Sequence, residues 1–271
     1  MRSALLRGRE HLHIGAVDTV AEGPAAIAIS IGGREKSYTH TDPNEDAAVF
    51  ALGSVGTLVA VADGHRGSEA AEVALDHLAG DPAAQWIETG EVDSASWERH
   101  VLAVLCDANE HILRELRNTE KQGARTTIAL ALVVPERDLL LYAAMGDSHI
   151  FEVRPGGVED LAPYATEDGK PTFLGTGPET PESLRGNCSV GFHTLAGIRA
   201  LVLATDGLSE RGVGIADPEA AVAEVVAAAS EQPAALRARE TARGVAETAL
   251  AAQRRNPSGD NVSAAVVWVD A

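Results

Sequence analysis

Two short apolar runs joined by a tight turn mark the first ordered region of the chain. Residues 46–52 and 57–62 are rich in Val, Leu and Ala, and a turn with a glycine at each end separates them. Two such runs around a glycine turn predict a β-hairpin. Residues 25–31 form an earlier apolar run that is followed by two glycines and predicts another strand, whereas residues 1–9 are expected to be a loose terminus.

Helical periodicity follows the hairpin. Apolar side chains recur every three or four positions within residues 68–80 and again within residues 94–117, which predicts two helices. The period then changes, and three consecutive apolar segments predict strands at residues 126–134, 139–145 and 149–153. Because short turns join these strands, we expect them to pair in antiparallel fashion.

The C-terminal part of the chain combines an irregular stretch with a second pair of helices. Residues 155–198 contain many Gly, Pro, Thr and Glu residues and show no sustained period, so we interpret them as a long flap-like insertion. A buried strand is predicted at residues 200–204 and a last strand at residues 262–269. Two alanine-rich helices are predicted between them, at residues 218–229 and 233–254.

The predicted elements occur in the order strands, two helices, strands, two helices and a final strand. This order is typical of an α/β (α+β) fold in which mainly antiparallel sheets are covered by layers of helices. No internal repeat or linker divides the chain. We therefore expect residues 1–271 to form a single domain, with a variable N-terminal segment at residues 1–24.

Composition and charge narrow the classes of function. The 271 residues are 45% hydrophobic but only 4% aromatic, so the core must consist mainly of aliphatic side chains. The formal net charge of −18 argues against nucleic acid or an anionic membrane as a partner, and its simplest interpretation is solubility. Cys106 and Cys188 are too few for a disulfide framework or a thiolate metal site. Because no apolar segment is long enough to span a bilayer or to serve as a signal peptide, we expect a cytoplasmic protein.

Three carboxylates are predicted to meet at one end of the hairpin. Glu45 and Asp46 lie at the entrance of its first strand and Asp63 at the exit of its second, so antiparallel pairing brings these ends together. Carboxylates this close repel each other unless a cation lies between them, and oxygen-only ligands favour Mg²⁺ or Mn²⁺. The same residues are also typical of ordinary polar turns, so the hairpin alone leaves both interpretations open.

Further acidic turns support the metal hypothesis. Asp63, Asp147, Asp206 and Asp260 each lie in a turn next to an apolar strand, and each has a glycine as its neighbour. Glycine allows the backbone to approach a cation closely and leaves its carbonyl free to act as a ligand. Four such turns, together with the acidic residues before the hairpin, can converge at one rim of a layered sheet structure.

These turns belong to motifs that occur in the order and approximate spacing of a known family. The motifs are Asn44-Glu45-Asp46, Ala62-Asp63-Gly64-His65, Gly146-Asp147-Ser148, Ala204-Thr205-Asp206-Gly207-Leu208 and Gly259-Asp260-Asn261. On these residues the chain resembles the metal-dependent protein phosphatases of the PP2C class, from about residue 44 to residue 269. Each motif is weak alone, but five of them in sequence are specific.

The resemblance implies a fold and a set of metal ligands. The fold is a four-layer α-β-β-α sandwich of two mainly antiparallel sheets, with a pair of helices on each outer face. Asp63 would bridge two Mn²⁺ or Mg²⁺ ions, and the Gly64 carbonyl would complete one of them. Asp206 and Asp260 would bind one ion of the pair.

The remaining acidic residues complete the implied site. Glu45 and Asp46 would hold the other ion or its waters, and Asp147 matches the family's ligand for a third, weaker metal. Two cations that bridge a water lower its pKa, present hydroxide to a phosphoryl group and neutralise the charge that develops there. His65, next to Asp63, is then the candidate general acid for the leaving alkoxide, whereas its position alone equally fits a hydrogen-bonded surface histidine.

The chain departs from the family pattern at two positions that bear on substrate binding. Thr41 stands where the family commonly has a phosphate-binding arginine, and Arg34, His40 and Arg66 are the candidates to reach the same place. A small-residue motif that usually begins with glycine begins here with Arg125, which we interpret as a surface side chain.

A third departure concerns the predicted insertion, which occupies the place of the family's substrate-contacting flap. It lacks the Asp-His-Ser element often found at the start of the flap, although Phe173-Leu174-Gly175 fits the later Leu-Gly. Substrate choice is therefore the feature that the sequence defines least.

Three hypotheses for function follow from the sequence. The leading one is a metal-dependent phosphatase that acts on phosphoserine and phosphothreonine in proteins and opposes a Ser/Thr kinase. The second is a regulatory binding module that keeps the fold without turnover, which the missing arginine favours and the intact carboxylate set opposes. The third is a phosphomonoesterase for a small metabolite, built on the same metal core.

Overall fold

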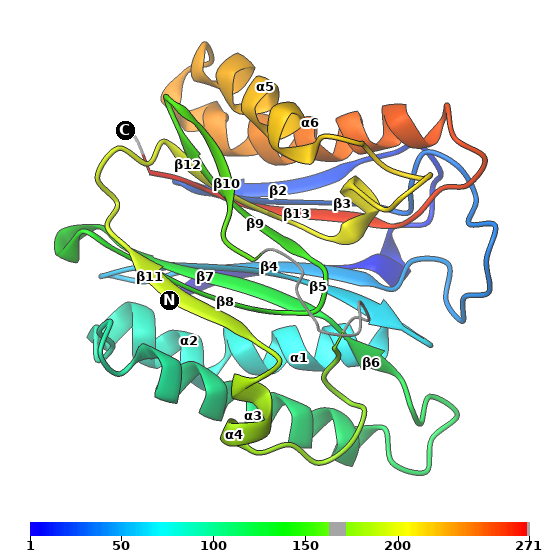
Figure 1. Cartoon of the computed structure of the whole chain (residues 1–271), viewed down its shortest axis with the longest axis horizontal. Coiled ribbons are helices and arrows are strands. Elements are labelled where there is room, and N and C mark those ends of the chain that lie inside the picture. Colours follow the sequence, from blue (N-terminus) through cyan, green and yellow to red (C-terminus); the bar gives the residue numbers. More distant parts are fainter. Residues whose placement is uncertain (163–171, 270–271) are drawn as a thin grey trace.

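The computed structural model describes residues 1–162 and 172–269, and two β-sheets lie face to face with helices on both outer faces (Figure 1). Every described strand pair is antiparallel. The predicted four-layer α-β-β-α sandwich is confirmed.

The first sheet contains the predicted hairpin. Its strand order is β1-β4-β5-β7-β8-β11, and β6 pairs with the end of β5. The hairpin strands β4 and β5 place Asp46 directly opposite Asp63. The bounds are β1 (Arg2–Arg7), β4 (Asp46–Leu52), β5 (Thr57–His65), β6 (Arg125–Thr126), β7 (Ile128–Val134), β8 (Leu139–Met145) and β11 (Ser189–His193).

The second sheet brings three of the acidic turns together. Its strands are β10 (Gly157–Asp160), β9 (His149–Arg154), β12 (Ala200–Ala204), β13 (Val262–Trp268), β3 (Ala25–Ser30) and β2 (Asp18–Glu22), in that spatial order. Because β12 pairs with both β9 and β13, its end lies beside the start of each neighbour. Asp206 follows β12, Asp147 precedes β9 and Asp260 precedes β13, so the three turns lie at one edge of the sheet.

Helices cover the outer face of each sheet. The long helices α1 and α3 pack on the first sheet, and α5 and α6 pack on the second (Figure 1). The bounds are α1 (Glu69–Ala79), α2 (Asp81–Ala84), α3 (Trp97–Glu115), α4 (Pro181–Arg185), α5 (Pro218–Ser230) and α6 (Ala234–Gln253). None of the described helices is long and apolar enough to cross a membrane.

The inner strands are buried on both faces because each sheet lies between helices and the other sheet. Along β4, Val49 faces α1 and α3, whereas its neighbours Ala48 and Phe50 face the second sheet. Strands buried on both sides read as continuous apolar runs, which is why the sequence revealed them clearly. The small aliphatic side chains allow the layers to pack closely with few aromatic residues.

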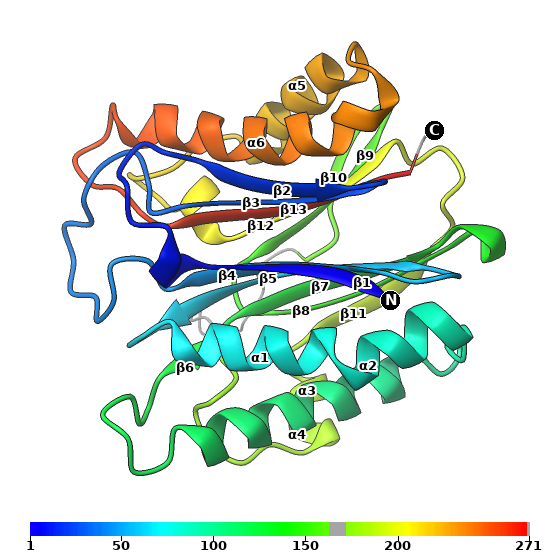
Figure 2. The same ribbon diagram turned by 180° about the vertical axis from the view of Figure 1, so that it is seen from behind.

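Two sequence expectations are wrong. Residues 2–7 are not a loose terminus, because they form β1 and pair with β4 along the edge of the first sheet (Figure 2). The stretch at residues 155–198 is not irregular throughout, because its described residues include β10, α4 and β11, and β11 pairs with β8. Strands β1, β10 and β11 are partly exposed at sheet edges, so their sequences lack the apolar run that marks an inner strand. Residues 163–171 of the predicted insertion lie outside the described residues.

Candidate metal centre

Asp63, near the end of β5, and two aspartates from separate turns form the most compact acidic group of the described residues, which we call the open cluster. One carboxylate oxygen from each of Asp63, Asp147 and Asp206 lies within 4.8 Å of the other two. Asp63 is buried, and the other two are half-buried. A buried oxygen of Asp147, Oδ1, has no hydrogen-bond partner among the described residues. The open cluster therefore offers closely spaced carboxylate oxygens, one of which is buried and has no donor among the described residues.

Electrostatics makes the open cluster unfavourable without a cation. Burial raises the pKa of Asp63 well above its usual range, and the charges of Asp206, Asp46 and Asp260 raise it further. Burial also raises the pKa of Asp206, with added repulsion from Asp260 and Asp147. Buried like charges of this kind favour either protonation or a bound cation.

The spacing of the open cluster fits a divalent metal ion. Mg²⁺ lies about 2.1 Å from its oxygen ligands, so two ligands of one ion are about 3 to 4 Å apart. The 4.8 Å limit on the oxygen separations of Asp63, Asp147 and Asp206 is close to this range. A purely carboxylate donor set suits Mg²⁺ or Mn²⁺ rather than zinc. The residues present therefore fit the type of metal that the sequence predicts.

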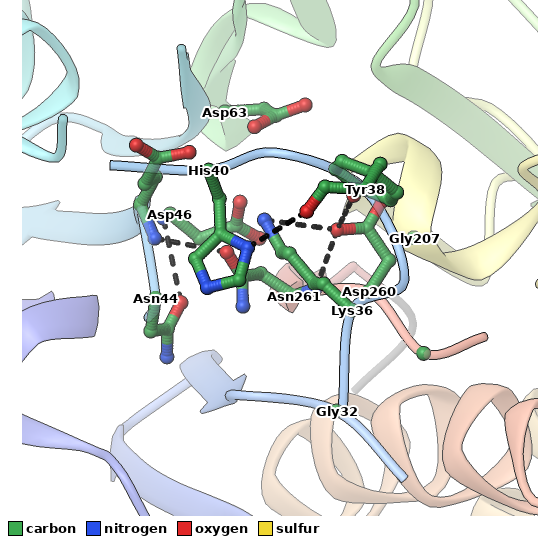
Figure 3. A network of polar contacts seen from close by, with 12 residues as sticks. Gly32, Lys36, Tyr38, His40, Asn44, Asp46, Asp63, Gly207, Asp260 and Asn261 are labelled. Atoms are coloured by element: carbon green, nitrogen blue, oxygen red, sulfur yellow. Dashed lines mark hydrogen bonds and ion pairs between the residues drawn. The ribbon is translucent and has the colours of Figure 1, made fainter. Parts of the chain in front are cut away.

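The other three predicted carboxylates form a closed group, Glu45, Asp46 and Asp260, in which each side chain accepts hydrogen bonds from the chain itself. Figure 3 shows Asp46 and Asp260 of this group. The Thr205 hydroxyl donates to Asp46 Oδ2 at 2.7 Å. Glu45 Oε1 accepts backbone N–H bonds from residues 41, 42 and 67, the shortest being 2.6 Å from Gly67.

A lysine that the sequence did not single out completes the closed group. The Lys36 ammonium lies 3.1 Å from Asp260 Oδ1, and its side chain is only 6% exposed. The Tyr38 hydroxyl donates to the same oxygen (Figure 3). Burial alone would lower the pKa of Lys36, but attraction to Asp260, Asp63 and Asp46 outweighs burial and raises it. Lys36 is therefore a cation of the chain inside the acidic centre.

Glu210 is a second residue that sequence reasoning missed. Burial and the charge of Asp260 raise its pKa to about 7. Its Oε2 atom is buried and has no hydrogen-bond partner in the described part of the chain. The sequence feature that could have identified Glu210 is its position four residues after Asp206, on the turn that follows β12.

Gly64 supports the site through its small size. A Cβ atom at this position would lie 2.5 Å from the Glu45 carbonyl oxygen and 2.8 Å from that of Gly67. Glycine is therefore required for the close approach of the segments that carry Glu45 and Asp63. The contacts of Gly64 do not test whether its carbonyl binds metal, so that role stays a prediction.

Hydroxyl side chains fix the backbone of the open cluster. Thr126 donates to the Asp63 carbonyl at 2.9 Å, and Thr127 Oγ1 accepts the Asp63 N–H at 3.2 Å. Thr127 also contacts the Ser148 hydroxyl at 3.0 Å, next to Asp147. These bonds hold the end of β5 against the turn between β8 and β9, so the aspartates keep their spacing without a direct bond between them.

His149 connects the turn that carries Asp147 to the turn that carries Asp206. Its Nε2 atom lies 2.6 Å from the Ser209 hydroxyl, on the turn that carries Asp206. Its Nδ1 atom lies 2.7 Å from Asp160 Oδ2 on β10. Since His149 is two residues after Asp147, these contacts join the Asp147 and Asp206 turns.

His65 lies against the open cluster. Its Nε2 atom is 3.7 Å from Asp63 Oδ2 and has no hydrogen-bond partner among the described residues. Its ring packs edge-on against Phe173, with 4.6 Å between the centroids. Burial lowers the pKa of His65 to about 4, with further lowering by Arg125 and Lys36. The imidazole is therefore neutral at pH 7 in the absence of ligands.

The side chains proposed to replace the missing phosphate-binding arginine make their contacts outside the group of carboxylates. Thr41 contributes only its backbone N–H, to Glu45. Arg34 donates to the Asn256 carbonyl at 2.6 Å, and His40 contacts the Tyr38 carbonyl at 3.0 Å. Arg66 is exposed and sits in a left-handed turn with φ 68°.

Arg125 is not the surface side chain that the sequence suggested. It is half-buried, and its guanidinium carbon lies 4.4 Å from the centroid of Phe173. Its Nε atom is buried without a hydrogen-bond partner in the described part of the chain. Phe173 therefore packs against both Arg125 and His65.

A comparison with protein families identifies the family of the chain. A family model described as Protein phosphatase 2C matches residues 35–253, so the chain belongs to the protein phosphatase 2C family. The predicted resemblance is confirmed by this match. No curated protein matches the chain.

Solved structures of bacterial phosphatases share the fold. A bacterial serine phosphatase matches with a TM-score of 0.68 at 17% identity, covering 92% of this chain and 98% of that one. The S. agalactiae serine/threonine phosphatase matches with a TM-score of 0.64 at 20% identity, covering 94% and 100%. The catalytic domain of PstP, a serine threonine protein phosphatase solved with two manganese ions, matches with a TM-score of 0.62 at 18% identity, covering 94% and 100%.

Proposed function

We propose that this protein is a metal-dependent phosphatase that hydrolyses phosphoserine and phosphothreonine in proteins and opposes a Ser/Thr kinase in the cytoplasm. The open cluster carries the proposal, because its buried carboxylates have the donor type and spacing of a divalent metal site. Membership of the protein phosphatase 2C family and the manganese ions in the related PstP domain support it.

The ligands would be the seven residues predicted from the sequence. Asp63 and the Gly64 carbonyl would help to hold two Mn²⁺ or Mg²⁺ ions. Asp206 and Asp260 would bind one ion of the pair, Glu45 and Asp46 would hold the other ion or its waters, and Asp147 would serve a third ion. Bound ions of this kind supply a water of lowered pKa and neutralise charge on the phosphoryl oxygens. The Lys36 ammonium and the Tyr38 hydroxyl would compete with a metal ion for Oδ1 of Asp260.

His65 is the proposed proton donor to the leaving alkoxide. Its Nε2 atom points into the centre without another partner, as such a donor requires. Its pKa of about 4 keeps it neutral before substrate binds. A phosphate dianion placed beside the ring favours the protonated imidazole, so the acid is formed where the substrate binds.

The test is turnover of an aryl phosphate with Mn²⁺ by the wild-type protein and by Asp63→Asn and Asp206→Asn. We expect turnover that EDTA abolishes and that both variants lack. Asp107→Asn is a matched control, since Asp107 is exposed on α3. Full activity of the Asp63 and Asp206 variants in metal-free buffer would contradict the mechanism.

The occupied Asp260 favours one alternative, a regulatory module that keeps the fold without turnover. Calorimetry with Mn²⁺ distinguishes the two, because a module binds metal or partner but hydrolyses no phosphopeptide. A panel of phosphopeptides and phosphorylated metabolites separates the protein phosphatase from a small-molecule phosphomonoesterase.

A further inference from the structure

Arg125 occupies an unusual position at the edge of the acidic centre. It lies on β6 directly opposite His65 on β5, and Figure 1 shows β6 beside the end of β5. Residues paired directly across an antiparallel ladder project from the same face. The ring of Phe173 contacts both side chains, at 4.6 Å from His65 and 4.4 Å from the Arg125 guanidinium. The guanidinium is therefore close enough to the ring for a cation–π attraction.

This guanidinium lacks the partners that similar groups have elsewhere in the molecule. Arg154 lies 2.5 Å from Glu152, and Arg7 lies 2.8 Å from Asp76. Arg125 forms no ion pair with a described carboxylate, and its buried Nε donor is unsatisfied by the described residues. A buried donor without an acceptor is costly, so this arrangement is expected where a ligand supplies the acceptor.

The position of Arg125 indicates which part of a substrate it meets. His65 lies 3.7 Å from Asp63, and Arg125 lies beside His65 across the ladder. The residues of the same segment that hydrogen-bond to Asp63 are instead Thr126 and Thr127. If His65 protonates the leaving oxygen, the peptide that carries this oxygen extends toward Arg125. The guanidinium then faces the peptide rather than the transferred phosphoryl group.

There is room for a peptide next to this edge. A cavity of about 570 Å³ is lined in part by Ala124, Gly175, Arg114 and Arg117. Gly175 packs against the backbone of Arg125, because a Cβ at this glycine would lie 3.2 Å from Arg125 Cα. The cavity therefore lies beside the backbone of the segment that carries Arg125.

We propose that Arg125 is a specificity-determining residue that binds a carboxylate side chain adjacent to the phosphorylated residue of the substrate. The inference rests on the proposed phosphatase function. A planar guanidinium binds a carboxylate through two parallel hydrogen bonds, which an uncharged amide side chain cannot replace. Because the chain carries a net charge of −18, an acidic substrate segment requires such a local cation close to the site.

The test uses pairs of phosphoserine peptides that differ in one residue, Glu in one peptide and Gln in the other, placed before or after the phosphoserine. In at least one pair, the wild-type protein with Mn²⁺ should show a kcat/KM about tenfold higher for the Glu peptide, mainly through KM. Arg125→Met should reduce this ratio to about one. Arg125→Lys keeps the positive charge but cannot form two parallel hydrogen bonds with a carboxylate, so it should give an intermediate ratio.

Arg243→Ala is the matched control for charge. Arg243 pairs with Glu247 on α6, on the other outer face of the sandwich, so its loss changes the net charge equally and should preserve the ratio. Equal wild-type kcat/KM for every Glu and Gln pair would overturn the inference. A preference that persists in both Arg125 variants would also overturn it, as would a variant that slows both peptides by the same factor.

Turnover of p-nitrophenyl phosphate by the wild-type protein separates this inference from the proposed function. If the wild-type protein hydrolyses the aryl phosphate but shows no peptide preference, only the role of Arg125 is wrong. If it hydrolyses neither substrate class with Mn²⁺, the phosphatase proposal fails and the inference fails with it. Should Arg125→Met not fold, Arg125→Gln and the lysine variant provide the same ratio.

Discussion

The open cluster and the closed group contain three carboxylates each, yet they differ in what surrounds them. The oxygens of the open cluster converge within 4.8 Å, and no lysine or arginine of the described residues forms an ion pair with them. Each member of the closed group already accepts a hydrogen bond, and Asp260 also has the Lys36 ammonium 3.1 Å away. The comparison shows that the sandwich gathers the carboxylates, whereas local donors decide which of them are free to bind a metal.

The donors of the closed group come largely from one segment. Lys36, Tyr38 and the backbone N–H groups of residues 41 and 42 all belong to the connection between β3 and β4. This connection is absent from the open cluster, whose aspartates lie near the end of β5 and on two turns. The donors of the closed group engage one oxygen of each of its carboxylates, so a metal ion would compete with them there, whereas the open cluster includes a buried oxygen of Asp147 that has no donor among the described residues.

Replacing one aspartate from each group should change the stability of the metal-free protein in opposite directions. Asp260→Asn leaves the buried Lys36 ammonium without its anion and should destabilise the protein by about 3 kcal/mol, as breaking a buried ion pair does. Asp206→Asn removes a repelling carboxylate and should stabilise it by about 1 kcal/mol. Urea unfolding in EDTA measures both, and a change of the same sign in both variants would refute the distinction.

The histidines beside the two groups should differ in their effect on turnover. His65 contacts Asp63, so His65→Ala should lower kcat on a phosphoserine peptide by about 10²-fold to 10⁴-fold. The loss should be much smaller on p-nitrophenyl phosphate, whose leaving group needs no proton. His40→Ala, next to the closed group, should change neither rate by more than about twofold. Equal losses of His65→Ala on both substrates would argue against proton donation.

The stability of the metal-free protein should fall as the pH rises. Burial, with the charge of Asp260, raises the pKa of Asp46 to about 7 despite the Thr205 hydrogen bond. Between about pH 4 and pH 7 the unfolded chain has lost this proton while the folded chain retains it, so unfolding becomes easier as the pH increases. One such carboxylate contributes about 1 kcal/mol per pH unit. Thermal unfolding in EDTA should show this slope and saturating Mn²⁺ should remove it, whereas a rise in stability over this range would contradict the assignment.

Replacing Lys36, the cation of the closed group, should make that group bind metal more readily, as the open cluster is expected to do. Lys36→Met should raise the affinity for Mn²⁺ about tenfold, because a divalent ion no longer competes with the ammonium for Asp260. Lys121→Met is the control, since Lys121 pairs with Asp42 and Glu69 rather than with the centre. Calorimetry measures both affinities. Weaker binding by Lys36→Met would show that the lysine supports the metal site instead of competing with it.

The sequence predicted the acidic centre well because its features are local. Each aspartate lies at the end of a strand with a clear apolar run, and a glycine next to it marks the turn. The inner strands have continuous apolar runs and the four long helices have a clear helical period, so these elements were also predicted. The edge strands β1 and β11 were missed because an exposed edge strand needs no continuous apolar run.

The donors around the centre could not be predicted in this way. Lys36 and Tyr38 lie in a connection without a period, and only the folded chain shows that both contact Asp260. Arg125 was interpreted as a surface residue because its packing on Phe173 joins two segments almost fifty positions apart. Contacts of this kind depend on tertiary packing, which local sequence patterns do not encode.

A crystal structure of the protein with Mn²⁺, with the ions located by anomalous scattering, tests the central claim most directly. The account predicts an ion bound by Asp63 and Asp206, and a Lys36 ammonium that no longer contacts Asp260. Saturating Mn²⁺ without an anomalous peak at the open cluster, and with Lys36 still paired to Asp260, would contradict it.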